Sequence, residues 1–110
     1  MPKTELKTFN MQFSGSKPDD SGTITTSGSV SFDTNVFGAD AAIKSWTLRY
    51  PTDNNDYNLQ VIGARIFDVS FHDKSVSFKG SLQLKDDGKN MVDASRSSMA
   101  VLVIAVTADW

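Results

Sequence analysis

The sequence predicts an all-β fold, a single antiparallel β-sandwich or small barrel of seven or eight strands, on three observations. Apolar residues alternate with polar ones at a period of two along most of the chain, which is the pattern of half-buried strands. Turn signals recur about every ten residues, and no stretch has the spacing of an amphipathic helix. Twelve aspartates stand against one glutamate, and aspartate favours turns whereas glutamate favours helices.

The predicted strands follow from this alternation in chain order, and turn-forming residues separate them. The second strand has an apolar face and a serine and threonine face, with a bulge at Gly28. Pro51 ends the third strand, and Gly63 divides the next apolar stretch into two strands. The last strand is apolar on both faces, which indicates a central strand covered on both sides or a strand inside an oligomer. The strands cover residues 9–13, 23–32, 44–50, 57–71 (two strands), 75–85 and 101–106.

The composition fits one domain that spans residues 1–110. A hydrophobic content of 39% and a charged content of 22% permit a buried core, and the length leaves little room for a second one. The net charge is -2, and the cations are not clustered as phosphate binding requires. We therefore expect no nucleic-acid partner.

The N-terminal residues lack the apolar segment of a secretory signal peptide. The most apolar run, residues 99–108, is about half as long as a transmembrane helix needs to be. We therefore expect a soluble protein without membrane insertion, which is cytoplasmic or released by a non-classical route.

Motifs for catalysis or metal binding are scarce. The chain has no cysteine, which excludes disulfides, thiolate zinc sites and a cysteine nucleophile. His72 is the only histidine and lies in a predicted hairpin turn, with no nucleophile motif to pair with it. The loop 86–90 is similar to a calcium loop in composition, but it lacks the alternating acidic spacing and the closing glutamate. We predict no enzyme, no cofactor and no metal site, and we leave open whether an Asp-rich loop binds calcium.

The segment 46–57 is the strongest candidate for a ligand-binding site. Sugar recognition uses its mixture of side chains, because a flat aromatic ring stacks on C–H groups while planar polar groups bind hydroxyls. The competing interpretation places Trp46 and Tyr50 in the core, since they share a face with Leu48. The candidate ligand-binding residues are Trp46, Arg49, Tyr50, Asp53, Asn54, Asn55, Asp56 and Tyr57.

Two predicted strand regions are similar to those of a known family. They are residues 65–78 (RIFDVSFHDKSVSF) and residues 101–105 (VLVIA), and a polar loop precedes the second. In these regions the chain resembles the H-type lectins, a family of small β-sandwich domains. The tryptophan of that family's final strand is absent, because Leu102 or Val103 stands there. The resemblance implies a trimer or hexamer that binds galactose-type sugars, and it transfers no sugar-binding residue.

The leading hypothesis is a non-catalytic binding module that binds a carbohydrate or glycoconjugate and acts as a homo-oligomer. The alternative is a structural or assembly protein such as a phage tail or fibre subunit, and a small hydrolase ranks third. The oligomer is expected because large apolar residues remain after one core is filled, and a symmetric partner covers them. We also expect Trp110 to be ordered and packed. The residues assigned to the core are Phe9, Phe13, Phe32, Leu48, Phe71, Phe78, Leu82 and Ile104.

Overall fold

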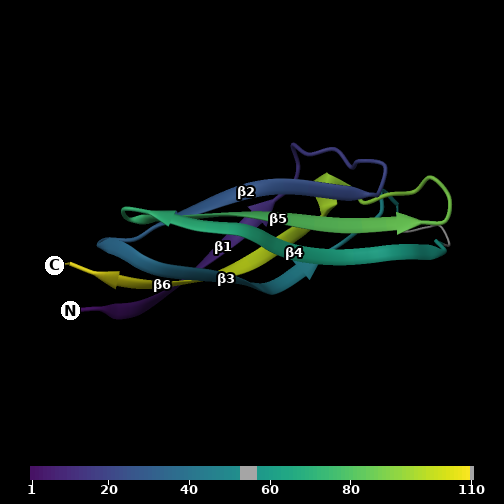
Figure 1. Cartoon of the computed structure of the whole chain (residues 1–110). Helices are drawn as coiled ribbons and strands as arrows, with labels where there is room; N and C mark the ends of the chain where they lie inside the picture. The colour runs from purple at the N-terminus through teal and green to yellow at the C-terminus, as the bar shows by residue number, and fades with distance from the viewer. Residues whose placement is uncertain (53–56, 110) are drawn as a thin grey trace.

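The computed structural model describes residues 1–52 and 57–109, and the described chain is almost entirely β-structure (Figure 1). The all-β prediction is therefore confirmed. The molecule is elongated, with extents of 56 × 20 × 20 Å. Its elements are β1 (Lys3–Gln12), β2 (Thr23–Ser31), β3 (Asn35–Thr47), β4 (Leu59–His72), β5 (Ser75–Asp86), the 3-10 turn η1 (Ala94–Arg96) and β6 (Ser98–Ala108).

The six strands form two antiparallel sheets of three strands each. Sheet A has the order β1-β6-β3 and sheet B the order β2-β5-β4, so strands distant in sequence lie side by side (Figure 1). The pairing of β1 with β6 runs without interruption from Lys3 opposite Thr107 to Gln12 opposite Ser98. The two sheets do not close into a barrel in the described part of the chain, so the barrel alternative is wrong.

One hydrophobic core receives side chains from both sheets. Phe9 of β1 meets Phe78 of β5 edge to face, with ring centroids 5.5 Å apart and an interplanar angle of 84°. Such an arrangement sets the positive edge of one ring against the negative face of the other. The largest fully buried side chains are Phe13, Phe78, Met11, Ile24, Leu82, Met99, Val76, Val101, Val103 and Thr107.

The structure describes six strands where the sequence predicts seven or eight, because Gly63 does not interrupt its strand. It pairs with Gln83 inside the continuous strand β4. The irregularity of β4 lies between Phe67 and Ser70 instead. Gly28 is not a bulge either, since it pairs with Phe78 in a regular ladder.

The two faces of β6 differ in burial. Val101, Val103 and Ala105 point into the core and are fully buried. Ile104 has the opposite parity and lies on the outer face of sheet A, so its assignment to the core is wrong. Phe71, at the end of β4, is also more exposed than predicted, at 45%. Within a single chain, β6 is therefore covered on its inner face only.

Within the described ranges, no helix has the length and apolar character needed to cross a membrane.

Candidate functional site

The predicted ligand-binding segment is only partly within the described structure. Asp53, Asn54, Asn55 and Asp56 lie outside the described residues. Of the remaining four, the structure brings Tyr50 and Tyr57 together as a stacked pair, with ring centroids 3.8 Å apart.

The stacked tyrosines make contacts with the rest of the protein. Tyr57 donates a hydrogen bond from its hydroxyl to the carbonyl of Thr52 at 3.0 Å. Tyr50 packs against the hydrophobic core, and its buried hydroxyl has no hydrogen-bond partner among the described residues. Burial raises the pKa of Tyr50, and the nearby charge of Asp86 raises it further, so this phenol stays neutral. The competing interpretation of Tyr50 as a packing residue therefore fits the structure better.

The other two residues, Arg49 and Trp46, make different contacts from this pair. The backbone N–H of Arg49 donates to Ser97 Oγ at 3.1 Å and its carbonyl accepts from the N–H of Asp93 at 2.8 Å. Trp46 is 52% exposed and borders a shallow hollow of about 210 Å³ near one end of sheet A. That hollow is lined by Asn10, Gln12, Ser45, Trp46, Thr47, Ser98, Met99 and Ala100.

The loop 86–90 is held by its own aspartate. The carboxylate of Asp86 accepts hydrogen bonds from the backbone N–H of Gly88 (2.9 Å) and from both the backbone and the side-chain nitrogen of Asn90 (3.0 and 2.6 Å). The Asn90 side-chain hydrogen bond, above all, holds the pKa of Asp86 below its usual range, although burial opposes it. Both carboxylate oxygens of Asp86 therefore already accept hydrogen bonds within the turn. No cluster of three or more histidine or acidic side chains suited to a metal occurs within residues 1–52 and 57–109.

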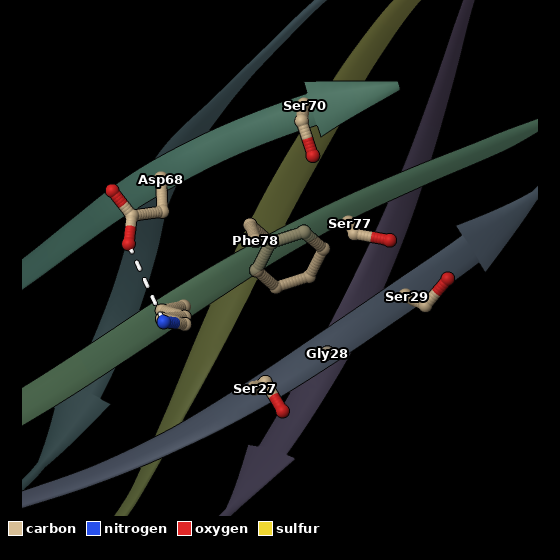
Figure 2. Close-up of a pocket in the computed structure, with 8 residues that line it drawn as sticks. Ser27, Gly28, Ser29, Asp68, Ser70, Ser77 and Phe78 are labelled. Atoms are coloured by element: carbon tan, nitrogen blue, oxygen red, sulfur yellow. Dashed lines mark ion pairs between the residues drawn. The ribbon is translucent and has the colours of Figure 1, made fainter. Parts of the chain in front are cut away.

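A larger hollow lies on the outer face of sheet B, and we call it the serine groove (Figure 2). Its volume is about 490 Å³, and it is open to solvent. All three strands of the sheet contribute to it. Its lining residues are Ser27, Gly28, Ser29, Asp68, Ser70, Ser77, Phe78 and Lys79.

The serines of the groove follow directly from strand alternation. Ser27 and Ser29 are two residues apart in β2 and share the outer face, opposite the buried parity of Ile24. Ser29 pairs with Ser77 of β5, and Ser77 pairs with Ser70 of β4. These three hydroxyl side chains therefore form one row across the sheet, at strand spacings of about 4.8 Å.

The charged part of the groove depends on the bulge in β4. Asp68 has a backbone φ of 53°, in the left-handed region that few residues other than glycine, asparagine and aspartate adopt. A bulge redirects the side chains next to it. Here the carboxylate of Asp68 lies 3.4 Å from Lys79 Nζ, and both side chains remain more than half exposed (Figure 2). The groove thus presents a carboxylate and an ammonium group beside the row of serines.

Sequence reasoning identified only one component of this groove. The alternation of residues 23–32 predicts the hydroxyl face of β2, but no motif marks Asp68 or Lys79. The signal for Asp68 would have been a break in alternation after Phe67, which the apolar residues on either side conceal. His72 lies at the end of β4 as a highly exposed side chain 3.3 Å from Asp73, in the predicted hairpin turn.

The chain matches no family model, and comparisons with characterised proteins and with solved structures also gave no match.

Proposed function

We propose that this protein is a non-catalytic binding module of β-sandwich architecture, and that its serine groove binds a carbohydrate or glycoconjugate. One observation carries the proposal. Three strands bring four serine hydroxyls, a carboxylate and an ammonium group to one open hollow of about 490 Å³.

The chemistry of the groove matches a polyhydroxylated ligand. A sugar hydroxyl both donates and accepts hydrogen bonds, and a serine hydroxyl can serve either role. Asp68 can accept from a pair of neighbouring hydroxyls, Lys79 can donate to others, and hydrogen bonds to charged groups are the stronger ones. The small serine side chains leave room for a ring above the sheet.

The openness of the groove to solvent favours a chain of sugars over a single one. An open polar site exchanges hydrogen bonds with water for hydrogen bonds with ligand, so each sugar adds little free energy. Several linked sugars along the three strands would add their contributions while losing translational freedom once.

A glycan array followed by calorimetric titration with the best glycan tests the proposal. Asp68→Asn removes the charge but keeps a side chain that tolerates the left-handed backbone, so the fold should persist. We expect it to weaken binding about tenfold or more, the loss of one charge-assisted hydrogen bond. Ser29→Val should also weaken binding, because it fills the groove at a position where strands favour valine. Asp20→Asn, in an exposed turn, is the charge-matched control and should leave affinity unchanged.

Trp46 provides the comparison with the site that the sequence predicts. If the groove is the site, Trp46→Ala leaves glycan affinity unchanged. A loss of binding in Trp46→Ala together with full binding in Asp68→Asn would move the site to the surroundings of Trp46. Retention of no glycan at all would refute the carbohydrate proposal.

The outer face of sheet A favours a second function, self-assembly. Its apolar side chains have no role in the serine groove, which opens on the other sheet.

A further inference from the structure

The two outer faces of the molecule have opposite chemistry. The outer face of sheet B carries the serine row and the groove. The outer face of sheet A carries Leu102, Ile104 and Val106 along its central strand, with Leu6 of β1 opposite Ile104. Leu6 is 61% exposed and Val106 is 42% exposed. Apolar side chains grouped in this way on a sheet commonly mark an interaction surface.

Small side chains lie at one end of this face and larger ones at the other. From one end of β6 to the other, the outward residues are Ser98, Ala100, Leu102, Ile104 and Val106. The small residues border the 210 Å³ hollow beside Trp46, and the large residues form a ridge at the other end. The face therefore has a hollow and a ridge on either side of Leu102.

Two residues of opposite charge on β3 also lie on either side of the level of Leu102. Asp40 pairs with Ile104, two residues from Leu102 along β6. A bulge between Ile43 and Ser45 leaves Lys44 level with Ala100, two residues from Leu102 in the other direction. Both charged residues are exposed. The negative charge thus lies beside the ridge and the positive charge beside the hollow.

We propose that this face binds a second copy of the chain, with the two β6 strands antiparallel and a two-fold axis between the sheets at Leu102. The axis places Leu102 against the partner's Leu102. It places Ile104 over the partner's Ala100, so that the ridge of each copy enters the hollow of the other. It also places Asp40 near the partner's Lys44, twice in the pair. An isologous contact requires such self-complementarity, and this face has it in both size and charge.

The available area agrees with a specific but modest contact. The 11 residues of β6 span about 36 Å, and three strands span about 14 Å, which makes about 500 Å² for each copy. The pair would bury about 1,000 Å², near the lower limit for a specific interface, so we expect a weak dimer whose population depends on concentration. Its apolar centre and polar border also match the usual composition of an interface.

The pair leaves the serine groove of each copy exposed on the opposite sheet. Dimer formation therefore does not depend on what the groove binds. It does cover the hollow that Ser98 and Ala100 border.

Sedimentation velocity of the full chain, from low micromolar to submillimolar concentration, tests the proposal. We expect the mass to rise from 12.0 kDa to twice that value. Leu102→Lys sets two ammonium groups against each other on the axis and should weaken the dimer at least about tenfold, the cost of a buried like-charge contact. Ser77→Lys, in the central strand of sheet B, is the matched control and should dimerise normally. Thermal melts of both variants show that the fold is retained.

A charge swap tests the antiparallel arrangement. Asp40→Lys should weaken the dimer, because the new lysine faces the partner's Lys44. Combining it with Lys44→Asp restores opposite charges and should restore the dimer. A constant 12.0 kDa mass, a trimer, an unaffected Leu102→Lys dimer or a double variant without recovery would each overturn the proposal.

Discussion

Gly28 should tolerate no side chain, because two aromatic rings occupy the space next to it. A Cβ atom at this position would lie 2.7 Å from Phe9 Cε1 and 2.9 Å from Phe78 Cε2. The two rings also contact each other edge to face, and Phe78 is only 1% exposed, so the Phe78 ring cannot withdraw freely. Overpacking of this kind costs about 1–3 kcal/mol. Alanine regains about 0.5 kcal/mol over glycine in a strand, which leaves a net loss of about 0.5–2.5 kcal/mol for Gly28→Ala.

Urea denaturation measures this loss, with Gly63→Ala as the matched control. A Cβ atom at Gly63 would have its nearest neighbour at 3.7 Å, an ordinary contact. Gly63→Ala should therefore be neutral or stabilising by about 0.5 kcal/mol. In a Phe9→Leu background, the smaller side chain should reduce the cost of Gly28→Ala, which a double-mutant cycle detects.

The reasoning about Gly28 is refuted if Gly28→Ala is as stable as Gly63→Ala. It is also refuted if the cost is the same with leucine in place of Phe9, since the clash would then not involve that ring.

Three further changes have defined outcomes. Tyr50→Phe removes a buried hydroxyl without a described partner, so thermal melting should show equal or higher stability; a loss of more than about 1 kcal/mol would reveal a partner. Hydrogen bonds from Asn90 lower the pKa of Asp86. The ionised Asp86 should therefore contribute fully to the free energy of unfolding above about pH 4, and this contribution should decline as the pH falls through the lowered pKa. Melting across acidic pH should show a weaker dependence in Asp86→Asn, and an unchanged acid profile would contradict this. Thr107 is fully buried and donates a hydrogen bond to Glu5 Oε2 at 2.6 Å. Thr107→Val should lower the free energy of unfolding by about 1 kcal/mol in urea titrations, whereas Thr107→Ser should lower it less. Equal losses in the two variants would assign the effect to packing.

The sequence by itself determined the class of fold, because period-two alternation and turn chemistry are local properties. The hydroxyl face of residues 23–32 and the turn at residues 86–90 are where the pattern predicts them. The segment 46–57 could be selected by composition, but composition does not say which of its side chains pack inward. Tyr50 packs against the core, whereas Trp46 is half exposed on sheet A.

The tertiary structure alone decided the orientation of β6 and the position of the groove. Both faces of β6 are apolar, so its pairing with β1, about 100 residues away, and with β3 sets Val103 inward and Ile104 outward. The bulge that turns Asp68 toward Lys79 arises in the same way, from a register between β4 and β5. The alternation shows which side chains of a strand are apolar, but it does not show which distant strand pairs with that strand. That information comes from packing, and it places both the serine groove and the apolar face.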